Sequence, residues 1–368
     1  MPIGSCDLWL MRSALGHGGI EVVRPRGVMR QRGMTIRTRA TRLDVARLAG
    51  VSSAVVSYVV NNGPKPVAAT TRHRVLEAIR ALDYYPDEAA RRLRGVGGST
   101  IGYLVPDIRN PFFADMTAAF NRALRLRGYH LLLADLGDDD AQERSYLELF
   151  RTKRVDGVIA WQTASVNDLV DFLTSSAIPF VLVAARHPGA SSIMIDEEAA
   201  ANLAVGHLKA LGHRRIAYVG PRDVTHHPQS RRPFVERALR QAGLPVNGEW
   251  FVDMAALDDA PTAARRLATA PGRPTAAIVH NDAFAIRIVS NLIELGSAVP
   301  GDLSIVGYDD LEASRYTRVP LTSIGYSKSD IGRLAIDLLL RRGEGATTRE
   351  ELTLPVALVV RASSARAG

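Results

Sequence analysis

The sequence predicts an α/β protein in which a small head of three helices precedes a larger core of two doubly wound parallel sheets. From residue 101 onward, short segments that are apolar on both faces alternate with amphipathic segments at helical spacing, a pattern typical of buried parallel strands joined by helices. Segment 41–83 has helical spacing but no strands of this kind. A chain of 368 residues is also long enough for two or three domains.

Residues 41–61 predict two short helices around a tight turn. Thr41 and Asp44 can cap the first helix, Gly50 can end it, and Ser52 can cap the second. We expect the first helix to bury Leu43, Val45, Ala46, Leu48 and Ala49, and the second to bury Val55, Val56, Val59 and Val60. Such a pair is typical of a helix-turn-helix that reads DNA, although similar pairs occur in helical proteins that bind no DNA.

A third helix and a linker complete the head. Residues 70–82 place Val75, Leu76, Ile79 and Leu82 on one face, which can cover the valines of the first pair. Segment 87–93 has helix-forming composition but is too short to be stable alone, and 94–100 is glycine-rich. The expected domains are a disordered extension at 1–36, a helix-turn-helix domain at 37–83, a hinge helix and linker at 84–98, and a core at 99–368.

The extension lacks the long apolar region of a signal peptide, and translation from either Met1 or Met34 is compatible with the sequence. Its Cys6 is the only cysteine of the chain, so no intrachain disulfide can form and an oxidising compartment is not indicated. No apolar run approaches the roughly 20 residues that a membrane span needs. We therefore expect a cytoplasmic protein with no membrane partner.

Positive charge is concentrated in the first quarter of the chain. Residues 1–98 hold 16 Lys and Arg and 7 Asp and Glu, a net charge of +9, whereas the whole chain has +8, so the remainder carries −1. Without the extension, 35–98 still holds 11 basic residues against 5 acidic ones. A basic module on a nearly neutral body is the distribution expected of a nucleic-acid-binding head, although basic termini can also serve only solubility.

Strand and helix alternate through the core. Strands are expected at 101–105, 130–134, 157–161, 180–184, 193–196, 215–219, 276–280 and 304–308, with helices that include 112–127, 141–151, 197–211, 234–242, 283–295 and 329–342. So many strands suit two subdomains better than one sheet. Ligands of open parallel sheets bind outside the carboxyl ends of the strands, so we expect the binding site in the loops that follow them.

Several segments, in their order along the chain, resemble the LacI/GalR (lactose-repressor/galactose-repressor) family of bacterial transcription regulators: DVARLAGVS, VSYVVN, YYPDEAARRL, VPDIRNPFF, RVDGVIAW, LGHRRIAYVG, HND and VGYDD. The resemblance covers residues 41–361. It implies a homodimeric repressor whose core is similar to a periplasmic binding protein. The implied partners are pseudo-palindromic, double-stranded operator DNA and a small-molecule effector in the cleft, for example a sugar.

The resemblance also implies that the chain crosses between the subdomains three times, near 186–190, 315–317 and 326–329. One subdomain would then comprise 99–187 with 317–327, and the other 190–315 with 329–361. The residues after Arg361 form a short tail without a leucine heptad, so we expect a dimer and no tetramer.

Family contacts to DNA can be carried over to individual positions of the head. Contacts to base edges or phosphates match Ser53, Ala54, Ser57 and Tyr58, and contacts to the DNA backbone match Asn61, Thr71 and Arg72. Tyr58 stands where the family often has Arg, and a tyrosine suits a phosphate or a thymine methyl better than a guanine. With small side chains beside it, we expect operator shape to contribute more than usual.

In the hinge, the resemblance implies that 87–93 folds when two copies meet in the minor groove. Leu93 would then wedge into the central base step, and Arg91 and Arg92 would lie near phosphates. A segment too short to be helical alone can become ordered on such a partner. The alternative is a plain basic linker.

Effector contacts are expected from residues near strand ends: Phe112, Phe113, Trp161, Ser230, Arg231, Asn281 and Asp309. Aromatic faces beside amide and carboxylate groups suit a polyhydroxylated ligand. The family usually has an Arg at the position of Ser230. Either Arg231 takes that role here, or the effector lacks the group that this Arg binds.

The sequence contains no G-x-S-x-G, P-loop, H-E-x-x-H or dinucleotide-binding motif, so we expect no enzyme, no catalytic residue, no cofactor and no metal. The alternative function is that of a periplasmic-type binding protein without a DNA-binding role, which the basic head and the lack of an export signal disfavour. Whether the effector is an inducer or a corepressor stays open.

Overall fold

The structure, a computed structural model, describes residues 40–61, 63, 65–84, 99–137, 140–153, 155–161, 165–222, 230–343 and 348–368. The extension at 1–36, the side chain of Asn61 and the hinge residues Arg91, Arg92 and Leu93 lie outside the described residues. The chain divides into two compact units, Met1–Gly97 and Gly98–Gly368. Within the described ranges, no single helix is long and apolar enough to cross a membrane, and only the bent pair Arg42–Ala49 and Ser53–Val60 reaches that length and composition.

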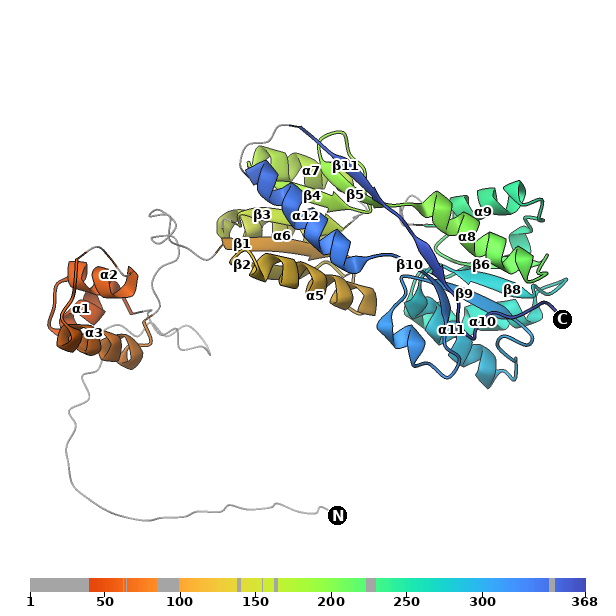
Figure 1. The fold of residues 1–368 in the computed structure, drawn as a ribbon, viewed down its shortest axis with the longest axis horizontal. Helices are drawn as coiled ribbons and strands as arrows, with labels where there is room; N and C mark the ends of the chain where they lie inside the picture. Colours follow the sequence, from red (N-terminus) through yellow and green to blue (C-terminus); the bar gives the residue numbers. More distant parts are fainter. Residues whose placement is uncertain are drawn as a thin grey trace, which may run out of the picture. The chain divides into compact units, whose positions relative to one another are not determined.

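The head consists of three helices, α1 (Arg42–Ala49), α2 (Ser53–Asn61) and α3 (Ala69–Ala81), shown at the red end of the colour scale in Figure 1. Thr41 and Asp44 form the predicted capping box at the start of α1. Gly50 ends α1 with a φ of 64°, a left-handed conformation that glycine adopts without steric cost. The chain bends by 103° between α1 and α2, as in a helix-turn-helix.

The core of the head is made of small side chains: Val45, Ala46, Ala49, Val56, Val59, Val75 and Ala78. The prediction that Leu43, Leu48 and Leu76 are buried is wrong, since they are 65%, 56% and 38% exposed. With about 100° between successive residues, the buried residues of α1 form one stripe, and Leu43 and Leu48 point more than about 90° away from its centre. Tyr84, just beyond the expected end of the domain at 83, also packs against this core.

The second unit contains two six-stranded sheets, each between two layers of helices (Figure 1), which confirms the predicted fold class. The first sheet has the order β11-β5-β4-β3-β1-β2 and is parallel throughout. Its strands are β1 (Ser99–Val105), β2 (Tyr129–Asp135), β3 (Gly157–Trp161), β4 (Phe180–Val183), β5 (Ser191–Ile195) and β11 (Glu351–Leu354). Helices α5 (Pro111–Arg125) and α12 (Lys328–Gly343) cover one face, and α6 (Asp140–Lys153) and α7 (Val166–Ser175) cover the other.

The second sheet repeats this order as β12-β10-β9-β8-β6-β7, with only β12 antiparallel. Its strands are β6 (Ile216–Gly220), β7 (Phe251–Asp253), β8 (Ala276–Val279), β9 (Ser304–Tyr308), β10 (Thr322–Gly325) and β12 (Ala357–Val359). Helices α10 (Ala260–Thr269) and α11 (Asp282–Glu294) cover one face, and α8 (Glu197–Ala210) and α9 (Arg232–Gln241) cover the other. Short 3-10 helices lie at Gly248–Trp250, Leu257–Asp259 and Glu312–Arg315.

The strand pairing corrects the predicted subdomain boundaries. β5 pairs with β4, so the chain does not leave the first sheet near 186–190. The first crossing to the second subdomain lies later, between Ile195 and Glu197. β10 pairs with β9, so residues 317–325 belong to the second subdomain, and no crossing occurs near 315–317. The predicted crossing at 326–329 is confirmed, because it joins β10 to α12, which packs against α5 in the first subdomain.

The C-terminal part returns to both sheets. β11 pairs with β5 and β12 pairs with β10, so the third crossing lies between Leu354 and Ala357, and 329–354 belongs to the first subdomain instead of the second. The residues after Arg361 are also more than a tail. Ser363 is fully buried, and its carbonyl accepts a hydrogen bond from the backbone N–H of Ile305 at 2.7 Å.

Candidate functional site

The candidate DNA-reading surface lies on α2. Ala54 is exposed, and Ser53, Ser57 and Tyr58 are partly exposed. The ring of Tyr58 lies over the backbone of Gly63, where an added Cβ would come within 2.7 Å of the ring Cδ1. The tyrosine ring therefore packs along the end of its own helix, where a larger residue at position 63 would displace it.

The first turn of α3 offers a second candidate contact with DNA. Thr71 is partly exposed and Arg72 is exposed, both within the first turn. The N-cap residue, Ala68, provides no side-chain hydrogen bond to the helix N-terminus. Backbone N–H groups at a helix N-terminus beside a cation are a favourable place for a phosphate oxygen.

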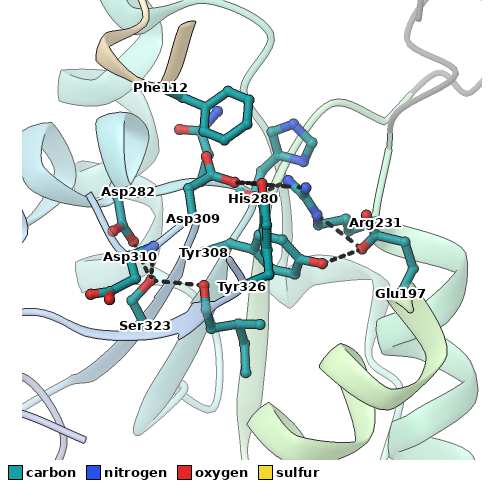
Figure 2. Close-up of polar contacts among 12 residues, drawn as sticks. Phe112, Glu197, Arg231, His280, Asp282, Tyr308, Asp309, Asp310, Ser323 and Tyr326 are labelled. Atoms are coloured by element: carbon teal, nitrogen blue, oxygen red, sulfur yellow. Dashed lines mark hydrogen bonds and ion pairs between the residues drawn. The ribbon is translucent and has the colours of Figure 1, made fainter. Parts of the chain in front are cut away.

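The candidate effector site is built around Arg231, which comes directly before α9 and has a side chain only 14% exposed (Figure 2). Its Nε donates to Glu197 Oε2 at 3.1 Å, and its Nη1 donates to the His280 carbonyl at 2.6 Å. Its Nη2 lies 3.9 Å from Asp309 Oδ1, and the guanidinium stacks on the Tyr308 ring at 3.5 Å from the centroid. The side chain of Arg231 is thus oriented from four sides.

Asp309 is the second centre of this site. It follows β9 with a φ of 98°, and Tyr326 donates its hydroxyl to Asp309 Oδ1 at 2.8 Å. Burial raises the pKa of the Asp309 carboxyl to about 6, although Arg231 and the Tyr326 hydrogen bond act in the opposite direction. The carboxylate is therefore largely ionised at neutral pH, where it balances the charge of Arg231.

An aromatic cluster from the first subdomain faces Asp309. Phe112 and Phe113 begin α5, where the Asn110 side chain caps the helix, and both rings contact Trp161 at the end of β3, with centroids 5.0 and 5.6 Å apart. Phe112 also contacts Tyr326 across the junction of the subdomains, at 6.2 Å. Figure 2 shows Phe112 above the carboxylate of Asp309. All three predicted aromatic residues are buried, at 3–5% exposure.

The side chains of Ser230 and Asn281 make hydrogen bonds to the backbone and none to Arg231 or Asp309 in the candidate site. Ser230 is 4% exposed and donates its hydroxyl to the Pro221 carbonyl at 2.6 Å. Asn281 caps α11 by accepting a hydrogen bond from the backbone N–H of Phe284 at 2.8 Å. Of the two arginine alternatives, the structure places Arg231 among the polar groups of the site and turns Ser230 away from them.

Asp282, next to Asn281, supports the site from behind. Its carboxylate accepts hydrogen bonds from Leu311 N at 2.9 Å and from the hydroxyls of Ser314 and Ser323 at 2.7 Å each. Gly307 permits this packing, since a Cβ there would lie 2.1 Å from Asp282 Oδ1. Burial, and then the charge of Asp309, raise the pKa of Asp282 to about 7.

Four polar residues of the site were missed by the sequence reasoning: Glu197, Tyr308, Tyr326 and Lys328. Tyr308 ends a predicted strand and Glu197 begins a predicted helix after a strand, so the strand-end rule could have identified both. Tyr326 and Lys328 follow β10, whose strand was not predicted, and the sequence analysis indicated residues 326–329 only as a crossing between the subdomains.

The site lies where binding is expected in this architecture. Both sheets have the core order 2-1-3-4-5, so their topological switch points lie between β1 and β3 and between β6 and β8. Phe112 and Trp161 come from the first switch point, and Arg231 and His280 come from the second. In the described part of the chain, no group of three or more His, Cys, Asp or Glu side chains could hold a metal ion. The arrangement can bind a polar ligand beside aromatic rings.

Comparisons with known proteins agree with this architecture. Residues 41–87 match the description "bacterial regulatory proteins, lacI family", and residues 205–364 match a periplasmic binding protein-like domain. The HTH-type transcriptional repressor PurR of Haemophilus influenzae is 35% identical over 332 residues, which span 88% of this chain and 98% of that protein. PurR of Vibrio cholerae is 34% identical, over 82% of this chain and 91% of its own length.

Solved structures give the same result. The lac repressor dimer bound to operator and an anti-inducer has a TM-score of 0.71 at 26% identity, covering 89% of this chain and all of that one. The regulator CelR in complex with cellobiose has a TM-score of 0.65 at 27% identity, covering 88% and 100%. These relatives are transcriptional regulators and not enzymes. With its helix-turn-helix and ligand-binding core, the chain is a DNA-binding transcriptional repressor controlled by a small molecule, and it belongs to the lacI family of bacterial regulatory proteins.

Proposed function

We propose that the effector binds against Arg231 and Asp309, with Phe112 as one aromatic wall. The charge of Arg231 is already balanced by Glu197 and Asp309, so the site favours a neutral ligand over an anion. Hydroxyl groups suit the carboxylates, and C–H faces suit the ring. The observation that carries the proposal is that side chains from both switch points converge on Asp309 (Figure 2).

An apolar pocket lies next to Arg231. It is lined by side chains of α8, α9 and the second sheet, among them Ala200, Ala204, Phe234, Ile278 and Ile324, with Arg231 at its polar end. We propose that a sugar or related polar metabolite lies on the polar side of this pocket. Structural neighbours of this chain are known with bound ribose or cellobiose. Trp161 and Phe113 support the position of Phe112, and Ser230 and Asn281 support the local backbone.

We further propose that the chain acts as a cytoplasmic homodimer on a pseudo-palindromic operator. Ser53, Ala54, Ser57 and Tyr58 would face the major groove, and Asn61, Thr71, Arg72, Arg91 and Arg92 would contact the DNA backbone. Leu93 would wedge into the minor groove. Because α2 offers no long cation for a guanine, shape and the hinge would contribute much of the specificity.

Effector and operator binding are coupled in this proposal through the angle between the two subdomains. The coupling is reciprocal, so an effector that weakens operator binding by a given factor is itself weakened by the operator by the same factor. An inducer and a corepressor differ only in the sign of this coupling. Equal effector affinities in the presence and absence of operator would contradict the mechanism.

The DNA proposal can be tested with an operator selected from a random pool of duplexes. Fluorescence anisotropy at low salt then measures the affinity of the full chain for the selected duplex, because electrostatic affinity is largest there. Selection of one pseudo-palindromic sequence is the expected result. Failure to enrich any sequence, with no binding even at low salt, would leave only the ligand-binding function.

The effector proposal can be tested by a thermal-shift screen of ribose, glucose, cellobiose and other neutral metabolites, since a specific ligand stabilises the fold by mass action. Arg231→Met is expected to weaken binding of any hit at least tenfold, because it removes the central cation. Arg232→Met is a matched control, since Arg232 pairs with Glu236 on α9 and stacks on Phe251. Equal affinities of Arg231→Met and the original protein would contradict the proposal.

A further inference from the structure

Lys328 lies at the junction of the two subdomains. It is the first residue of α12, which packs in the first subdomain, and it comes directly after the crossing from β10. Its ammonium donates to the backbone carbonyls of Asp309 and Asp310, at 2.7 and 3.0 Å. These two carbonyls belong to the turn after β9, in the second subdomain. One side chain therefore connects the two halves of the core.

The turn after β9 has an unusual backbone. Asp309 and Asp310 have φ values of 98° and 45°, a region that residues other than glycine rarely adopt. This conformation turns two consecutive carbonyls toward one point, where a single ammonium with three N–H donors can satisfy both. Such a conformation persists only when surrounding contacts hold it, and Lys328 supplies two of them.

The Lys328 ammonium also contacts the first subdomain. Asp115 on α5 places its Oδ2 3.6 Å from the ammonium, and the Lys328 side chain is only 17% exposed. Partial burial makes this ion pair less screened than one at the surface. Asp115, Lys328 and the β9 turn thus form one polar chain that runs across the junction.

Asp309 belongs both to the polar chain around Lys328 and to the candidate effector site. Its carbonyl is bonded to Lys328, and its carboxylate contacts Arg231 and Tyr326 in the candidate effector site. We propose that Lys328 is a positioning residue that couples the state of the Asp309 carboxylate to the angle between the subdomains. This inference rests on the proposed effector site. A ligand that pulls on the carboxylate rotates the turn, which makes or breaks the Lys328 bonds and shifts the subdomain equilibrium.

The structure also offers a matched comparison for Lys328. Lys209 on α8 donates to the Ala242 carbonyl at 2.7 Å, so it likewise caps a backbone carbonyl, but both partners lie within the second subdomain. If Lys328 acted only by satisfying a carbonyl, loss of either lysine would have the same kind of effect. If Lys328 couples the subdomains, only its loss changes the distance between them.

The test measures the distance between subdomains in the full-length protein. Spin labels are attached at Asp171→Cys on α7 and Gln241→Cys on α9, two exposed positions, in a Cys6→Ser background. Labelled chains are diluted with unlabelled ones so that each measured pair lies within one chain. We expect Lys328→Met to broaden and shift the distance distribution, Lys328→Arg to restore it, and Lys209→Met to leave it unchanged.

A distribution that stays unchanged in Lys328→Met would overturn the inference. If Lys328→Met does not fold, Asp115→Asn decides the question, because it removes the ion pair and leaves both carbonyl bonds. A partial broadening is then expected, and an unchanged distribution would overturn the inference. This measurement needs neither operator nor effector, so its failure is distinct from failure of the proposed function.

Operator affinity provides a second measurement with the selected duplex as probe. Lys328→Met, without any effector, is expected to change operator affinity about fivefold or more, a factor typical of coupling between sites. A residue with only a local structural role would leave this affinity unchanged in the folded protein. Equal affinities of Lys328→Met and Lys209→Met would therefore contradict the inference.

Discussion

Asp282 is expected to make the stability of the second subdomain depend on pH. Its carboxyl is fully buried, with a pKa raised to about 7 by burial and by the charge of Asp309. In the unfolded chain the same group titrates near its ordinary value of 3.8. Between these two values the folded protein keeps a proton that the unfolded chain has released.

The sign and size of the effect follow from this difference. The stabilising contribution is fully present below the unfolded pKa, falls as the pH rises and is lost once the pH passes the folded pKa near 7. A separation of about 3 pKa units corresponds to about 4 kcal/mol of unfolding free energy. The group is completely buried, so no reduction for solvent screening is needed.

Asp282→Asn removes the titration and retains most of the hydrogen bonding. The amide oxygen can accept from Leu311 N, and the amide nitrogen can donate to Ser323, whose hydroxyl also lies 3.3 Å from the Ile324 carbonyl. Between about pH 5 and pH 8, urea unfolding followed by circular dichroism should show that the variant gains stability relative to the original protein as pH rises. Ser314→Ala should extend the decline to higher pH than in the original protein, because it removes a hydrogen bond to the ionised form and so raises the folded pKa of Asp282 further.

Parallel pH profiles for the original protein and Asp282→Asn would refute this reasoning. They would mean that the Asp282 carboxyl has the same protonation state in the folded and in the unfolded protein across this pH range. Groups that do not interact with Asp282 contribute equally to both profiles, so the difference between the profiles reports Asp282 together with its charged neighbour Asp309.

Three further predictions address the head, the C-terminal residues and the hinge. Val56→Ala should destabilise the head by about 2 kcal/mol because Val56 is fully buried, whereas Leu48→Ala, at a position 56% exposed, should change stability by less than about 0.5 kcal/mol in thermal unfolding. Ser363→Ala should cost about 1–3 kcal/mol, since it leaves the Thr322 N–H without its acceptor at 2.8 Å, and equal melting curves would contradict this. Leu93→Ala should preserve folding but weaken operator binding strongly in an anisotropy titration, and unchanged affinity would exclude the wedge.

The structure distinguishes the two neighbouring residues Ser230 and Arg231, of which only Arg231 lies among the polar groups of the candidate site. The sequence left two alternatives, because an Arg that the family usually has is replaced by Ser230. The structure turns Ser230 toward Pro221 and places Arg231 on Tyr308. Two neighbouring residues before a helix point in different directions, and which of them lies among the polar groups of the candidate site depends on where the helix begins.

Local patterns were sufficient to predict the head and most strands. The capping box at Thr41, the end of α1 at Gly50 and the eight predicted strands can all be inferred from the pattern of residues close together in the chain. The burial of Leu43 and Leu48 was predicted wrongly, because apolar character alone does not say which stripe of a short helix faces its partners.

The sequence by itself therefore determined the helices of the head, eight strands of the core in their order, the basic charge of the head, and the strand ends from which Phe112, Arg231 and Asp309 reach the candidate site. Only the tertiary structure decided which sheet β5, β10 and β11 join, and with that where the chain crosses between subdomains. Strand pairing depends on residues far apart in the chain, so no local pattern specifies it. The contact of Lys328 with the Asp309 carbonyl likewise exists only because those pairings bring two distant segments together.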